Sequence, residues 1–140
     1  MSKVDIEAEF SSSAADVWAK IADFGGIGAW APGIEKCDLE GEGVGAVRRI
    51  AMGGMEIAER LEAIDDSARQ LSYSIVEGPM PVKNYLATIH VSEGADGGAK
   101  LAWSCDFEAP GMSDEQVGGM AAGMEGAYKG MCEGLKQLID

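Results

Sequence analysis

Residues 113–140 read SDEQVGGMAAGMEGAYKGMCEGLKQLID, a long stretch with the period of an α-helix. Its bulky apolar residues recur every three or four positions on one stripe, and its charged residues fall on another. The apolar stripe consists of Val117, Met120, Met124, Tyr128, Met131, Leu135 and Leu138. Ser113 and Gln116 have the spacing of a capping box, which marks a helix start. The stretch therefore predicts a long amphipathic C-terminal helix, around which the rest of the chain folds.

Five glycines of this helix share one shoulder between the apolar stripe and the charged face. They are Gly119, Gly123, Gly126, Gly130 and Gly134. Each costs about 1 kcal/mol relative to alanine inside a helix, so the shoulder requires a reason. Three reasons stay open: the close approach of another backbone, from an early helix or from the second subunit of a homodimer; room for a bound molecule; or a bare flank that the fold tolerates.

Length and charge limit the possible functions. A chain of 140 residues fits one domain, 1–140, with a real core. Its 11 basic and 24 acidic residues give a net charge of −13, which argues against nucleic acid or an anionic membrane as a partner. No apolar run approaches the ~20 residues of a membrane span, so we expect no membrane insertion. Residues 1–7 lack the apolar segment of a signal peptide, and we expect a cytoplasmic protein.

Cysteine and histidine do not suggest a metal centre. Cys37, Cys105 and Cys132 are odd in number and far apart, and His90 is the one histidine. This pattern favours free thiols in a reducing compartment over disulfides or a zinc site. Phosphate-binding loops, nucleotide-binding fingerprints and the nucleophile-elbow motif are also missing from the sequence. We therefore expect neither a metal nor a cofactor.

The beginning of the chain alternates between apolar and acidic residues. Residues 4–10 have the period of two that is typical of a strand with one wet face. Ser13 then caps a short helix through Val17 and Ile21. A second helical segment is expected from Phe24 to Trp30.

From residue 34 to residue 109 the pattern predicts an antiparallel meander of six strands, at 34–40, 45–52, 55–64, 70–77, 82–93 and 99–109. Alternation assigns their faces. The inward side chains are Tyr73, Ile75, Tyr85, Ala87, Ile89, Val91, Leu101, Trp103, Cys105 and Phe107. The outward ones are Thr88, His90, Ser104, Asp106 and Glu108. His90 is accordingly interpreted as a surface residue and not as a catalyst.

The Gly53-Gly54 turn fixes a register. A two-residue hairpin loop sets Met52 opposite Met55, Ile50 opposite Ile57, and Arg48 opposite Glu59. All six side chains share one face. Because this face is otherwise Met and Ile, it should be the inner one. Arg48 and Glu59 would then form a cross-strand ion pair directed into the interior.

Two interpretations of such a pair stay open. An internal salt bridge can fix register, although desolvation often offsets its attraction. Alternatively, Arg48 and Glu59 anchor the polar end of an otherwise apolar ligand, with the Tyr85 hydroxyl as a further donor. The second interpretation has a catalytic form, in which Glu59 acts as a general base or Tyr85 as an acid in a condensation, dehydration or isomerisation that needs no cofactor.

Several short motifs, in order along nearly the whole chain, carry a resemblance. They are Val17-Trp18, Asp23-Phe24, Trp30-x-Pro32-x-Ile34, Gly45-x-x-Arg48, Glu59-x-Leu61, Tyr73-x-Ile75, Tyr85 and Trp103. In these the chain resembles the helix-grip superfamily of START, birch-pollen-allergen and polyketide cyclase/dehydrase proteins, in which a curved sheet grips a C-terminal helix.

This resemblance implies a cavity between sheet and helix for a lipid, hormone, polyketide or aromatic molecule. Related hormone receptors have a cavity acid and a tyrosine at the places that match Glu59 and Tyr85. The resemblance also implies that the loop 77–82 lies at the cavity mouth. The receptors have a longer gate where this chain has Gly53-Gly54, so no hormone-triggered latch is expected.

We therefore expect an α+β helix-grip fold, with a curved antiparallel sheet of about seven strands around the C-terminal helix and two short helices after the first strand. The expected function is binding or transport of a small hydrophobic or aromatic ligand. The alternatives are a cofactor-independent cyclase, dehydratase or isomerase using the same cavity, with Glu59, Arg48 and Tyr85 as candidates, and an interaction module with a filled interior. The expected ligand-binding residues are Arg48, Ile50, Met52, Ile57, Glu59, Tyr73, Ile75, Tyr85, Ala87, Trp103, Cys105, Met120, Met124 and Tyr128.

Overall fold

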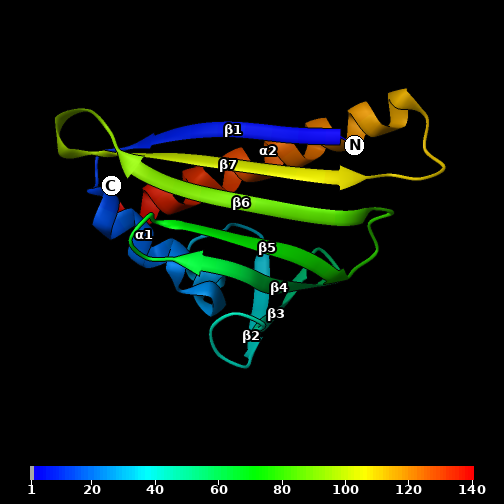
Figure 1. Ribbon diagram of the computed structural model, residues 1–140, viewed down its shortest axis with the longest axis horizontal. Coiled ribbons are helices and arrows are strands. Elements are labelled where there is room, and N and C mark those ends of the chain that lie inside the picture. Colours follow the sequence, from blue (N-terminus) through cyan, green and yellow to red (C-terminus); the bar gives the residue numbers. More distant parts are fainter. Residues whose placement is uncertain (1) are drawn as a thin grey trace.

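The computed structural model describes residues 2–140, and its strands form a single curved sheet (Figure 1). The strands within these residues are β1 (Ser2–Phe10), β2 (Ile34–Glu40), β3 (Val47–Met52), β4 (Met55–Asp65), β5 (Gln70–Glu77), β6 (Lys83–Glu93) and β7 (Ala99–Glu108). All neighbours pair antiparallel, in the order β1-β7-β6-β5-β4-β3-β2. The strands β2 to β7 form the predicted meander, and β1 pairs with β7, a pairing that the sequence did not predict.

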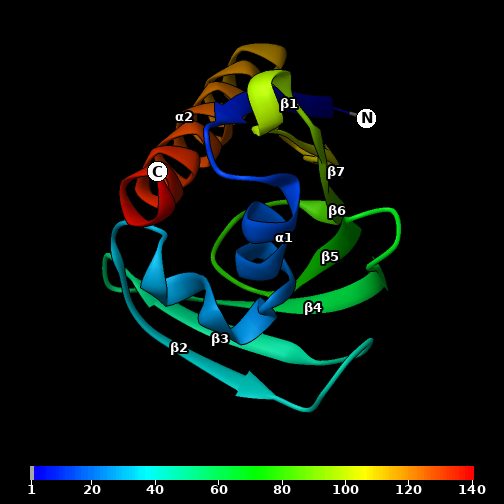
Figure 2. The ribbon, with the colours of Figure 1, turned by 90° about the vertical axis from the view of Figure 1, so that its left-hand side faces the viewer.

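The helices lie on the concave side of this sheet (Figure 2). After β1 come α1 (Ala14–Ala22) and the short 3-10 helix η1 (Phe24–Ala29), and η2 (Ala95–Gly97) lies in the β6–β7 turn. The long helix α2 (Asp114–Ile139) closes the chain. This arrangement confirms the predicted helix-grip fold. No helix among residues 2–140 is both long and apolar enough to cross a membrane.

The β3–β4 hairpin has the predicted register. Met52 pairs with Met55 and Arg48 pairs with Glu59. Gly53 and Gly54 have φ of +56° and +79°, the positive values that a two-residue turn matching the strand twist needs at both positions. The hairpin differs from prediction at its start, since β3 begins at Val47 and not at residue 45. Gly45 has φ of +94°, which is incompatible with an extended strand.

Helix α2 begins with the predicted capping box. The Ser113 hydroxyl accepts a bond from the Gln116 backbone N–H, and the Gln116 side chain accepts one from the Ser113 backbone N–H. Met124, Tyr128, Cys132 and Leu135 are its buried residues. At its end, the Asp140 carboxylate accepts bonds from two backbone N–H groups of the β1–α1 loop. The helix is therefore capped at its start and tied to the β1–α1 loop at its end. Its predicted apolar stripe faces the interior except at Leu138, which is exposed.

The glycine shoulder has two different explanations along its length. A Cβ at Gly134 would lie 2.2 Å from the Trp30 carbonyl oxygen and 2.7 Å from Pro32 Cδ, so the segment after η1 approaches the helix backbone closely there. Cβ atoms at Gly119, Gly123, Gly126 and Gly130 would meet nothing within 4 Å. Close approach of an early segment is thus confirmed at Gly134 alone, and a homodimer contact at the open positions stays a prediction.

This difference predicts opposite effects of the same substitution. Gly134→Ala should destabilise the protein by about 1–3 kcal/mol, because the new methyl group must displace backbone. Gly126→Ala should stabilise it by about 0.5–1 kcal/mol, because alanine favours the helix and the space is open. Urea unfolding of both variants measures the two values. Equal effects of the two substitutions would contradict the close approach.

Candidate functional site

A cavity of about 230 Å³ lies between α2 and the concave face of the sheet. Its walls are mostly aliphatic, sulfur-containing and aromatic side chains from strands β2 to β7, the β5–β6 loop, η1 and α2. The lining residues are Ile27, Ile34, Arg48, Ile50, Met52, Met55, Ile57, Glu59, Tyr73, Ile75, Met80, Tyr85, Trp103, Met124, Ala127, Tyr128 and Met131. The cavity is thus largely apolar, with a few polar groups directed into it.

Most of the predicted ligand-binding residues line this cavity, and three do not. Ala87 and Cys105 are fully buried, at 0% and 1% exposure, among side chains packed between the strands. Met120 lies one helical turn before Met124, where α2 has not yet reached the cavity. For these three the expected place in the pocket is wrong. Alternation identifies a buried face, and it does not tell which part of that face is packed and which part borders open space.

Sequence reasoning also missed several lining residues. Met55 was placed on the inner face with its hairpin partners but not among the ligand-binding residues, and Met80 lies in a loop, where alternation carries no information about direction. Ile27 comes from η1, and Ala127 is small enough to be read as helix surface. Met131 was already on the predicted apolar stripe, so the helical period could have identified it. Met80 agrees with the implied position of the 77–82 loop at the cavity mouth.

The predicted ion pair is present inside the cavity wall. Arg48 Nε donates to Glu59 Oε1 at 2.8 Å, and Arg48 Nη2 lies 2.7 Å from the same oxygen. The Arg48 side chain is 4% exposed and that of Glu59 is 13% exposed. The remaining guanidinium nitrogen, Nη1, donates to the Phe24 carbonyl oxygen at 3.1 Å. The pair therefore links β3, β4 and the start of η1.

Aromatic rings cover the Arg48 guanidinium. Its central carbon lies 3.9 Å from the centroid of the Phe24 ring and 4.9 Å from that of Tyr73. A cation over an aromatic face is attracted by the ring quadrupole, more so where water is excluded. Arg48 is thus held by hydrogen bonds to Glu59 and Phe24 and by contact with two neighbouring aromatic rings. The sequence predicted a helical segment from Phe24 to Trp30, but it did not predict that Phe24 contacts Arg48.

Three tyrosines supply further polar groups to the cavity wall. The hydroxyls of Tyr85 and Tyr128 are hydrogen-bonded to each other, and Tyr73 accepts a bond from Trp103 Nε1 at 3.2 Å. The Trp103 and Tyr128 rings stack with centroids 4.5 Å apart. Burial raises the pKa of all three tyrosines far above the ordinary value. They remain neutral hydroxyl groups over the physiological range of pH.

The cysteines are not activated as nucleophiles. Cys37, Cys105 and Cys132 are free thiols. Burial raises the pKa of Cys132 to about 12 and also raises the pKa of the other two. Because the thiolate is the reactive form, these thiols suit packing better than covalent chemistry.

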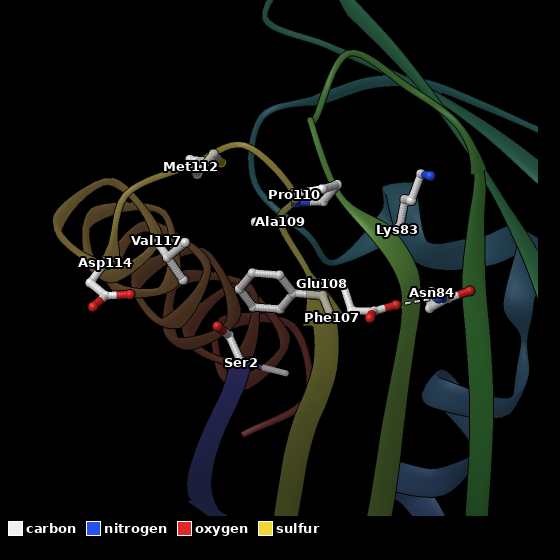
Figure 3. Close-up of a pocket in the computed structure, with 10 residues that line it drawn as sticks. All are labelled: Ser2, Lys83, Asn84, Phe107, Glu108, Ala109, Pro110, Met112, Asp114 and Val117. Atoms are coloured by element: carbon white, nitrogen blue, oxygen red, sulfur yellow. Dashed lines mark hydrogen bonds between the residues drawn. The ribbon is translucent and has the colours of Figure 1, made fainter.

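A second hollow, of about 570 Å³, lies at the ends of β6 and β7 beside the first turn of α2 (Figure 3). It is an open surface depression around Phe107, and the Asn84 side chain donates to the Glu108 carboxylate at its edge. A ligand there would keep much of its surface in water. We therefore place the candidate site in the smaller cavity beneath α2, where a ligand is more fully enclosed.

Comparison with known proteins finds a matching family and similar structures. A sequence model of the family described as "Polyketide cyclase / dehydrase and lipid transport" matches residues 1–140. The solved structure of XoxI from Bacillus cereus is similar, with a TM-score of 0.88 and 34% identity, covering 99% of this chain and 95% of that one.

Two proteins of Arabidopsis thaliana are also similar in sequence. MLP-like protein 423 is 33% identical over 117 aligned positions, which cover 74% of each chain. The abscisic acid receptor PYL6 is 32% identical over 105 positions, which cover 69% of this chain and 47% of the receptor. The chain thus spans less than half the length of that receptor.

Proposed function

The chain belongs to the polyketide cyclase/dehydrase and lipid-transport family, and from this premise we propose that it binds a small hydrophobic or aromatic molecule in the cavity beneath α2. The observation that carries the proposal is the composition of the cavity wall. An enclosed apolar space that contains an ion pair is the usual form of a small-molecule site.

The size of the cavity limits the ligand. An apolar protein cavity of about 150 Å³ takes up benzene, so a space of about 230 Å³ suits a molecule of one or two rings. A longer ligand would have to extend through the mouth between Met55 and Met80. Methionine side chains at this mouth can adapt to ligands of different shape, because they are unbranched and flexible.

Ligand binding should raise the thermal stability. A ligand at a hundredfold excess over its dissociation constant adds about 2.7 kcal/mol to the free energy of unfolding, which corresponds to several degrees in Tm. Thermal unfolding in the presence of one- and two-ring apolar compounds measures the rise in Tm. Native mass spectrometry of the same samples detects the bound compound. Ile57→Trp should abolish it by filling the cavity, whereas Val76→Trp, exposed on the neighbouring strand, should not. If no compound stabilises the protein or remains bound, the proposal fails.

A second function uses the same cavity. The Glu59 carboxylate and the Tyr85–Tyr128 hydroxyl pair both border it, so a proton acceptor and a proton donor face one space. This favours a cofactor-independent cyclase, dehydratase or isomerase as the alternative. The same samples distinguish the two functions, because a carrier returns its ligand unchanged and an enzyme returns a product of different mass or chromatographic mobility. We place either activity in the cytoplasm, where three unpaired cysteines stay reduced.

A further inference from the structure

We propose that the cavity selects neutral ring compounds that carry a hydroxyl group, a phenol or an alcohol, and that this hydroxyl donates to Oε2 of Glu59. The inference rests on the proposed function and names the chemical class of its ligand. It also assigns different roles to the two charged residues: Glu59 contacts the ligand, and Arg48 is a positioning residue.

Arg48 is already paired with a carboxylate and is less available than a free cation to an anionic ligand. Each of its three guanidinium nitrogens already has a partner, two on Glu59 Oε1 and one on the Phe24 carbonyl oxygen. Rings of Phe24 and Tyr73 lie against it, and only 4% of the side chain is exposed. A ligand carboxylate would compete for this cation with Glu59, which the chain itself supplies at no cost in association entropy.

Glu59 has one oxygen to spare. Both bonds from Arg48 go to Oε1, and within residues 2–140 no hydrogen bond reaches Oε2. Among the described residues, the only buried side-chain polar atom without a hydrogen-bond partner is the Trp30 indole nitrogen, so Oε2 is not a buried atom. Oε2 is therefore not sealed in the protein but borders open space, and Glu59 lines the cavity. A carboxylate oxygen accepts and does not donate, so the matching ligand group is a donor.

Charge decides which donor fits. The Arg48–Glu59 pair carries no net charge, so it offers little compensation to an ion that leaves water for an apolar cavity. A carboxylate ligand would in addition face the free oxygen of Glu59. An ammonium ligand would lose its hydration on entry, and the attraction of Glu59 would offset this loss only in part because Arg48 already balances the charge of Glu59. A neutral hydroxyl loses least on entry and still gains a hydrogen bond to a charged acceptor.

The test uses four probes with the same ring system at pH 7: naphthalene, 2-naphthol, 2-naphthoate and 2-naphthylmethylammonium. Their dissociation constants are measured by titration calorimetry and by quenching of tryptophan fluorescence, since Trp103 lines the cavity. A hydrogen bond to a charged group predicts that 2-naphthol binds at least about tenfold more tightly than naphthalene. Both ions should bind more weakly than 2-naphthol. Tighter binding of either ion, or equal binding of 2-naphthol and naphthalene, overturns the inference.

The variant Glu59→Gln links the selectivity to this residue. It removes the carboxylate and leaves the Arg48 charge uncompensated, so the preference for 2-naphthol over naphthalene should fall several-fold and 2-naphthoate should gain affinity. Glu62→Gln is the matched control, because Glu62 lies on the outer face of the same strand and pairs with Arg60. It should leave all four constants unchanged. Loss of selectivity in Glu62→Gln, or none in a folded Glu59→Gln, contradicts the inference.

The two proposals fail in different ways. If naphthalene binds in the cavity and 2-naphthol gains nothing, the proposed function stands and the selectivity is wrong. If none of the four probes binds, the proposed function fails and the inference fails with it. The measurements on the unchanged protein decide this even if Glu59→Gln does not fold.

Discussion

Replacing Arg48 by alanine is expected to lower the free energy of unfolding by about 3–5 kcal/mol. The substitution leaves the Glu59 carboxylate without its cation in a wall where its side chain is only 13% exposed. It also leaves the Phe24 carbonyl oxygen without the Arg48 donor and removes a group packed against two aromatic rings. Urea unfolding followed by circular dichroism measures the change.

Two further variants separate the buried pair from ordinary charge effects. Arg60→Ala is the matched control, since Arg60 lies on the outer face, is 48% exposed and pairs with Glu62; it should change stability by no more than about 0.5 kcal/mol. The double variant Arg48→Met/Glu59→Leu should recover most of the loss, because apolar side chains can replace a buried pair at little cost. An effect of Arg48→Ala no larger than that of Arg60→Ala would show that the pair is solvated.

None of the tyrosines should ionise while the protein remains folded. Tyr73, Tyr85 and Tyr128 are the three tyrosines of the chain, and burial raises the pKa of each. In the unfolded chain they ionise near pH 10. A spectrophotometric titration should therefore show no tyrosinate absorbance at pH ~10, followed by one cooperative step when the protein unfolds.

The sign of the accompanying stability change follows from linkage. Below pH ~10 both states keep the phenolic protons, and the contribution of the tyrosines to stability is constant. Above it the unfolded state loses protons that the folded state retains, so the free energy of unfolding falls by about 1.4 kcal/mol per pH unit for each tyrosine, or about 4 for all three. Tyr85→Phe should reduce this slope by roughly one third. Gradual ionisation near pH 10 in the folded protein would mean that the cluster is open to water.

The sequence predicted the fold through local signals that agree with one another. The Gly53-Gly54 turn and the alternation around it fixed the β3–β4 register, and the structure has the predicted pairs. The capping box and the apolar stripe fixed the start and the inner face of α2. These features depend on neighbours in sequence or across one hairpin, which is why periodicity and turn chemistry suffice to predict them.

The candidate site was only partly predictable. Alternation located Arg48 and Glu59 on the inner face, but it could not separate Ala87 and Cys105, which are packed, from Tyr85, which borders the cavity. Met80 and Ile27 reach the cavity from a loop and from η1, where no period assigns a direction. The ligand-binding role of all these residues stays a prediction.

By itself, the sequence determined the order of the elements, the hairpin register and the presence of opposite charges facing one another on an apolar face. Only the tertiary structure decided which oxygen of Glu59 is free, that Phe24 and Tyr73 enclose Arg48, and that Gly134 alone among the shoulder glycines meets another segment. The physical reason is distance along the chain. Local patterns specify which face of an element a residue occupies. Whether a polar atom has a hydrogen-bond partner depends on residues that only folding brings together.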